Sequence, residues 1–123
     1  MTDADRELLE RADAVAARAY APYSNFFVGA AARARDGRVF EGTNVENAAY
    51  PLGVCAEKTA LGRAVSEGVK PGEVEALAVT ASPCGGCRQW LVEFGLDRVI
   101  YRRTDGDVVV RTPAELLPDT FEL

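Results

Sequence analysis

Three cysteines and one glutamate are the residues of this chain best suited to chemistry. Cys55 and Glu57 stand two positions apart in VCAEKTA, and Cys84 and Cys87 form a C-x-x-C pair in SPCGGC, in a chain that contains no histidine. Thiolates bind soft divalent metals, and a zinc ion with three protein ligands keeps its fourth position open for water, as catalytic sites do. The pattern favours a zinc centre with Glu57 near enough to exchange protons with a water.

The three cysteines and Glu57 could also have roles other than a catalytic zinc site. Three thiols cannot pair completely, and a thioredoxin-like C-x-x-C would normally open the helix after an early strand rather than lie deep in the chain. A lone buried cysteine often serves as a small apolar core residue, which is the alternative for Cys55. A carboxylate could also close the fourth zinc position, in which case Glu57 would be a ligand.

Length, charge and composition indicate how many domains the chain forms and which kinds of partner it lacks. At 123 residues and 48% hydrophobic content, residues 1–123 are expected to form a single domain. A net charge of -5 disfavours a nucleic-acid partner, because affinity for phosphate backbones comes from clustered Lys and Arg. The acidic start, MTDADRELLERADA, differs from a secretory signal, and no apolar run reaches membrane-spanning length. We therefore expect a cytoplasmic protein without a membrane partner that acts on a small neutral substrate.

Strands and helices alternate in the predicted arrangement around the candidate residues. Asp36-Gly37 is a turn signal inside a predicted hairpin, and strand-like runs lie at residues 27–46 (the hairpin), 73–81, 99–103 and 106–111. Helical spacing and end signals predict helices at residues 2–20, 55–68, 85–95 and 112–118.

Two of the predicted helix starts carry all three thiols. Cys55 and Glu57 belong to the first turn of the helix at 55–68, and Cys84 and Cys87 lie at the start of the next one. A helix N-terminus stabilises nearby anions, so each thiol there is biased toward the thiolate that binds metal.

Four short motifs in a fixed order resemble those of one enzyme family. C-A-E at 55–57 and S-P-C-x-x-C-R-Q at 82–89 follow APYSNFFVGAA at 21–31 and NVENAAYP at 44–51. From about Ala19 onward the chain resembles the small homotetrameric zinc-dependent cytidine deaminases. The resemblance implies hydrolysis of cytidine and deoxycytidine to uridine and deoxyuridine in pyrimidine salvage. We expect a three-layer α/β/α sandwich with a mixed five-stranded sheet.

The resemblance implies a role for each of the four candidate residues. Cys55, Cys84 and Cys87 would hold one Zn²⁺ per chain, and the ion would let water attack C4 of cytosine near neutral pH. Glu57 would accept the proton of that water, deliver it to ring N3 and later help to protonate the departing amine.

The resemblance also implies a set of substrate contacts. Asn44 and Glu46, expected on the strand before the Y-P pair, would bind the ribose, while Phe26 would pack near the substrate and the N–H of Ala56 would donate to the base carbonyl. Phe121, after L-L-P, would reach into the active site of a neighbouring subunit of a homotetramer. The alternatives are that Asn44 and Glu46 are turn or solvent-facing strand residues and that Phe121 folds back onto its own domain.

Two features depart from the family pattern. Lys58 stands where relatives have Arg after C-A-E, so we expect a different geometry for the cation that offsets the thiolate charge. We expect Arg88 to hydrogen-bond the thiolates and nearby loops, the alternative being an ordinary exposed position. The connection in ALAVTASPCGG is several residues shorter than in relatives. The shorter loop leaves deamination of a modified or bulkier aminopyrimidine nucleoside, as in blasticidin-type deaminases, as an alternative. A zinc-stabilised module without turnover is another, although such a site has no use for Glu57.

Overall fold

A mixed five-stranded sheet forms the middle layer of the structure. The computed structural model describes residues 1–123. The strands follow the spatial order β2-β1-β3-β4-β5, in which β3 and β4 are parallel and every other neighbouring pair is antiparallel. Their bounds are β1 (Gly29–Ala34), β2 (Val39–Thr43), β3 (Val74–Val79), β4 (Arg98–Arg102) and β5 (Val108–Arg111).

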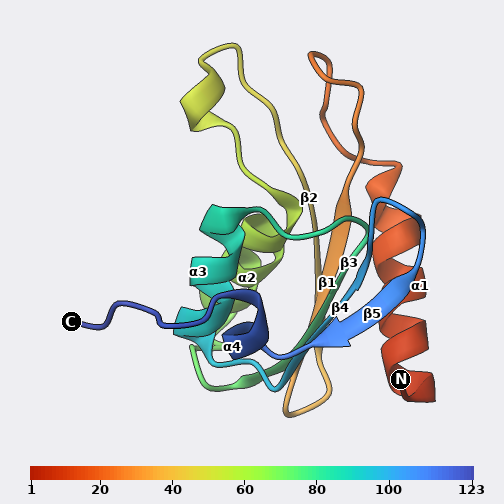
Figure 1. Ribbon diagram of the computed structural model, residues 1–123. Coiled ribbons are helices and arrows are strands. Elements are labelled where there is room, and N and C mark those ends of the chain that lie inside the picture. The colour runs from red at the N-terminus through yellow and green to blue at the C-terminus, as the bar shows by residue number, and fades with distance from the viewer.

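Helices cover both faces of this sheet. One face packs against α1 (Asp3–Ala16), and the opposite face packs against α2 (Ala56–Ser66) and α3 (Gly85–Phe94) (Figure 1). A 3-10 turn, η1 (Tyr50–Leu52), and a short C-terminal helix, α4 (Pro113–Leu116), complete the elements. The predicted three-layer α/β/α sandwich with a mixed five-stranded sheet is confirmed. None of the helices combines the length and the apolar character needed to cross a membrane.

Small residues bring the helices close to the sheet. Alternation along β1 sends Ala30 and Ala32 into the core beneath α2 and α3, whereas Ala31 joins the core beneath α1. Gly42 on β2 allows the closest approach, because a Cβ there would lie 2.4 Å from the backbone N of Ala60 on α2. This contact fixes the N-terminal half of α2, which carries Ala56, Glu57 and Lys58.

Several predicted element ends are confirmed and others are wrong. Gly37 at the hairpin turn and Gly95 at the end of α3 both adopt positive φ, of 96° and 64°, as predicted for a turn and a helix stop. Cys55 is the residue that precedes α2 rather than part of its first turn. The predicted helix at 2–20 ends at Ala16, and the hairpin predicted from residue 27 begins with β1 at Gly29.

A buried ion-pair network joins α1 to the sheet. The Asp5 carboxylate, 2% exposed, accepts hydrogen bonds from Arg98 on β4 at 2.9 Å and from Arg33 on β1 at 3.0 Å. Burial alone would raise the pKa of Asp5, but the two guanidinium groups outweigh burial and lower this pKa to about 2. Asp5 therefore stabilises the folded state in its ionised form.

The pH dependence of stability tests this network. The folded-state pKa of Asp5 lies below its value of 3.8 in an unfolded chain, so its contribution is complete above about pH 4 and disappears as the pH falls toward 2. We expect Asp5→Asn to lower the free energy of unfolding at pH 7 by about 2 kcal/mol. The difference from the wild type should shrink between about pH 4 and pH 2 in urea titrations.

The matched control is Asp13→Asn. Asp13 pairs with Arg102 through side chains that are 39% and 38% exposed, so its removal should change the free energy of unfolding by less than about 1 kcal/mol. A loss for Asp5→Asn no larger than for this control would contradict a structural role for the buried pair.

Candidate active site

The three thiols meet between the starts of α2 and α3. The Cys84 Sγ lies 3.4 Å from the Cys87 Sγ and 3.7 Å from the Cys55 Sγ, and all three sulfur atoms lie within 4.8 Å of one another. Cys84 caps α3, since its Sγ accepts a hydrogen bond from the backbone N–H of Cys87 at 3.4 Å. The predicted convergence of two helix starts therefore brings together a set of donors suited to a single metal ion.

Mutual contacts make the thiols unequal in acidity. The Cys87 thiol is the main cause that lowers the pKa of Cys55 to about 6, and the Cys84 thiol and the positive charge of Lys58 act in the same direction. The same contact with Cys55, reinforced by burial, raises the pKa of Cys87 above its usual range. The lowered pKa of Cys55 favours its thiolate, the form that binds metal.

Glu57 lies beside the thiols in a nearly dry position. The residue is 3% exposed and belongs to the first turn of α2. Burial raises the pKa of Glu57 to about 7, and the negative charge of Cys55 adds to that effect, whereas contact with Cys87 and the charge of Lys58 oppose it. A carboxyl group with this pKa can both accept and donate a proton near neutral pH, although a bound dication would favour its ionised form.

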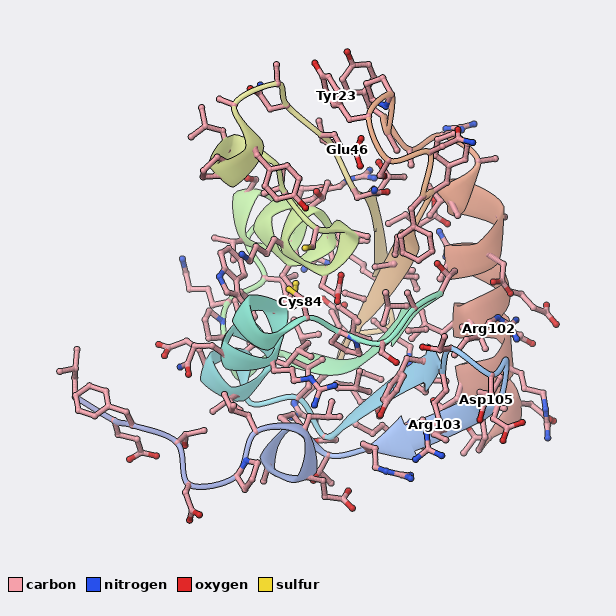
Figure 2. The ribbon with its side chains drawn as sticks, turned by 45° about the horizontal axis from the view of Figure 1, so that its top comes forward. Tyr23, Glu46, Cys84, Arg102, Arg103 and Asp105 are labelled. Atoms are coloured by element: carbon pink, nitrogen blue, oxygen red, sulfur yellow. The ribbon has the colours of Figure 1, made fainter.

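A cavity of about 510 Å³ opens in front of Glu57 and the thiols. Its walls come from the loop before β1, the loop that follows β2, the start of α2 and the short connection after β3. Figure 2 shows Tyr23 and Glu46 on the two loops at the end of the molecule that lies above Cys84. The charged side chains that line the cavity are Glu46 and Glu57, and no Lys or Arg lines it.

Asn44 and Glu46 lie just beyond β2, not on a strand as predicted. Both line the cavity, but each also holds the loop opposite. The Asn44 amide accepts from Val28 N at 2.9 Å and donates to Phe26 O at 2.8 Å. Glu46 accepts from the backbone of the same loop, and hydrogen bonding from Ser24 is the main cause that lowers its pKa. Both side chains therefore organise the cavity wall before any ligand arrives.

The remaining predicted residues differ in position. Phe26 and Ala56 line the cavity, with Phe26 62% exposed and Ala56 buried. Phe121 is 78% exposed on a C-terminal tail that leaves the body of the molecule, and it does not line this cavity (Figure 1). The alternative that Phe121 folds back onto its own domain is therefore wrong for this structure.

The two cationic neighbours of the thiols take separate roles. Arg88 donates to the carbonyl oxygens of Pro83 at 2.9 Å and Leu116 at 3.0 Å. The expected contact with the surrounding backbone is therefore present, whereas the expected hydrogen bonds to the thiolates are not, because these two carbonyl oxygens engage the guanidinium group. Lys58 reaches from α2 to α3, where its Nζ lies 6.0 Å from the centre of the Trp90 ring. The short strand-to-helix connection predicted before Cys84 is also present, because β3 ends at Val79 and α3 begins at Gly85.

The amino-acid sequence matches one protein family over most of its length. The family described as "Cytidine and deoxycytidylate deaminase zinc-binding region" matches residues 2–103, which is more than half of the chain. The chain belongs to the cytidine and deoxycytidylate deaminase family.

Relatives in this family match over nearly the whole chain. A cytidine deaminase of Halalkalibacterium halodurans is 46% identical over 127 residues, covering 95% of this chain and 94% of its own. A cytidine deaminase of Sporosarcina psychrophila is 47% identical over 112 residues, covering 85% of this chain and 81% of its own. The crystal structure of cytidine deaminase from Burkholderia pseudomallei superposes with a TM-score of 0.89 at 48% identity, covering 98% of this chain and 100% of its own.

The donor set fits the metal of this deaminase family. Three thiol groups from two helix starts offer the soft ligands that zinc prefers, and they lie close enough together to share one ion. Cys55, Cys84 and Cys87 are the residues that would hold it. Zn²⁺ is therefore the cofactor of this protein.

Metal analysis tests the ligand assignment. Cys84→Ser keeps the size of the side chain but replaces a soft donor with a hard one, so the variant should lose its zinc, whereas the wild type should carry one ion per chain. Chelation should lower the Tm of the wild type and leave that of the variant unchanged, because metal binding is coupled to folding.

Ser82→Ala is the matched control, since Ser82 lines the same cavity two residues away and is not among the predicted ligands. A Cys84→Ser protein that retained a full complement of zinc would exclude Cys84 from the ligand set.

Proposed function

We propose that this protein hydrolyses cytidine and deoxycytidine to uridine and deoxyuridine, with release of ammonia, as a step of pyrimidine salvage in the cytoplasm. The observation that carries the proposal is the meeting of three thiols and the buried Glu57 at the inner end of a cavity that Cys55, Cys84, Glu57, Asn44 and Glu46 line. Thiolate ligands also fit a reducing compartment. Residues 1–123 would act as one domain, since both helical layers pack on a single sheet.

Glu57 would move the protons of the reaction. Zinc, when bound, supplies a Lewis acid that allows water to act as a nucleophile near neutral pH. Glu57 takes one proton from the attacking water as the C4–O bond forms, and it delivers that proton to ring N3. It then transfers the second proton of the former water to the amine, so that the C4–N bond breaks, ammonia leaves and a carbonyl remains at C4. A pKa near neutrality suits a group that must work in both directions.

The cavity walls would orient the nucleoside. Ala56 would offer its N–H to the base carbonyl, Phe26 would cover the base, and Asn44 and Glu46 would bind sugar hydroxyls. The ionised Glu46 and the absence of Lys or Arg from the walls disfavour a phosphate on the sugar. We therefore propose nucleosides, not nucleotides, as substrates.

Turnover of a substrate panel tests this proposal. The zinc-loaded wild type should convert cytidine and deoxycytidine, followed by the change in ultraviolet absorbance, much faster than deoxycytidylate or blasticidin S. Glu57→Gln removes the proton acceptor but keeps the shape of the side chain, so kcat should fall by about 10²- to 10⁴-fold.

The Glu57→Gln protein should keep its zinc and its Tm. Loss of zinc in this variant would make Glu57 a ligand instead of an acid–base group, and faster turnover of blasticidin S than of cytidine would favour the bulkier-substrate alternative.

We also propose that four copies form a homotetramer in which Phe121 completes the site of a neighbour. Large apolar side chains stand exposed on the loops around the cavity, including Tyr50 at 90% and Leu52 at 70%, and Phe121 is exposed on the tail. Burying such side chains contributes about 1.5 to 3 kcal/mol each, which favours association. A closed assembly would satisfy all of these surfaces at once.

Paired mass and kinetic measurements test the shared site. Phe121→Ala should raise the KM for cytidine severalfold with zinc content unchanged, because one wall of each cavity would be lost. Leu123→Ala is the matched control on the same exposed tail. A fully active monomer in light scattering, or a KM for Phe121→Ala equal to that of the control, would rule the arrangement out.

A further inference from the structure

The Ser24 side chain connects two walls of the cavity. Its hydroxyl donates to the Glu46 Oε2 on one side and accepts from the backbone N–H of Phe26 at 3.0 Å on the other. The backbone N–H of Ser24 and that of Tyr23 both donate to the other oxygen of Glu46, at 3.1 and 2.9 Å. Ser24 is thus bonded both to the carboxylate expected to bind the sugar and to the residue expected to cover the base.

The hydrogen-bonding capacity of Glu46 is nearly used up by this loop. A carboxylate offers about four acceptor positions, and the three contacts from Tyr23 and Ser24 leave about one for a ligand hydroxyl. The direction in which that remaining position points depends on how the loop holds the carboxylate. A change at Ser24 should therefore alter sugar binding even without direct contact between Ser24 and the sugar.

The loop needs these contacts to keep its shape. Asn25, between Ser24 and Phe26, adopts a φ of 58°, a left-handed conformation that only a minority of residues other than glycine adopt. Hydrogen bonds on both sides of Asn25, through Ser24 before it and from the Asn44 amide to Phe26 O after it, hold this turn in place. Phe26, which is 62% exposed, has little core packing to fix it otherwise.

We infer that Ser24 is a positioning residue that fixes Glu46 and Phe26 relative to each other, so that the sugar and the base are recognised by one pre-organised unit. The inference rests on the proposed function. Sequence motifs alone do not assign such a role, because the Ser24 hydroxyl bonds a carboxylate on another loop as well as the backbone of its own loop. Pre-organised contacts raise affinity because less order must be created on binding.

Three variants test the role of Ser24 in the zinc-loaded protein. Ser24→Ala should raise the KM for cytidine about tenfold, the size expected when a hydrogen bond to a charged group is lost, with kcat changed by less than about twofold. Ser24→Thr keeps the hydroxyl and should restore the KM to within about twofold of the wild type. Ser66→Ala is the matched control, because Ser66 is an exposed serine whose hydroxyl donates to a carbonyl within α2.

A double-mutant cycle separates positioning from general stability. In a Glu46→Gln background the Ser24→Ala change should raise the KM by much less than in the wild type, because the partner of the hydroxyl is already altered. Zinc content and Tm should stay within error in Ser24→Ala.

Two results would overturn the inference. One is an unchanged KM for Ser24→Ala in an active protein, and the other is a raised KM that is fully additive with Glu46→Gln. Both leave the proposed function intact, whereas a wild type that converts no cytidine overturns the proposed function itself.

Discussion

The meeting of two helix N-termini at one point is the constraint on which the functional architecture depends. Three thiol groups can share a metal ion only if α2 and α3 begin within a few ångströms of each other, and both helices must therefore pack on the same face of the sheet. The parallel pair β3 and β4 makes this possible, because the connection between them must cross over the sheet and carries α3. Gly42 sets the position of α2 from the other side, since no side chain larger than hydrogen fits between β2 and the backbone of Ala60.

The electrostatics of the site follow from the same constraint. The neighbouring Cys87 and Cys84 thiols and the Lys58 ammonium lower the pKa of Cys55, while the dry surroundings of Glu57 raise the pKa of its carboxyl group. The pKa values of Cys55 and Glu57 are thus shifted in opposite directions although the two residues stand only two positions apart in the chain. Both shifts arise from burial and from contacts between the starts of α2 and α3, which the short motifs alone do not provide.

The sequence predicted the parts of this arrangement that local patterns determine. The hairpin at Asp36-Gly37, the stop at Gly95 and the short connection before Cys84 each follow from residues that are neighbours in the chain. Contacts between distant segments were harder to predict. The bond from Arg88 to Leu116 depends on where α4 packs, which no local pattern specifies.

The hydrogen bonds between the loops around the cavity are also contacts between distant segments that local sequence patterns do not predict. Asn44 and Glu46 were identified through a motif, but their bonds to the loop before β1 depend on a pairing between Tyr20 and Val45 that lies outside the regular sheet. Ser24 was overlooked although it lies in one of the motifs. The available signal was its hydroxyl two residues before Phe26, which is typical of a side chain that bonds its own backbone.

A crystal structure recorded at the zinc absorption edge, with uridine bound, would show which side chains bind the metal and which face the pyrimidine ring. We expect one anomalous peak per chain, bonded to the sulfur atoms of Cys55, Cys84 and Cys87. The Glu57 carboxylate should face the pyrimidine ring without bonding the metal. A Glu57 oxygen bonded to zinc as the fourth protein ligand would close the site and make it structural, which would contradict the account.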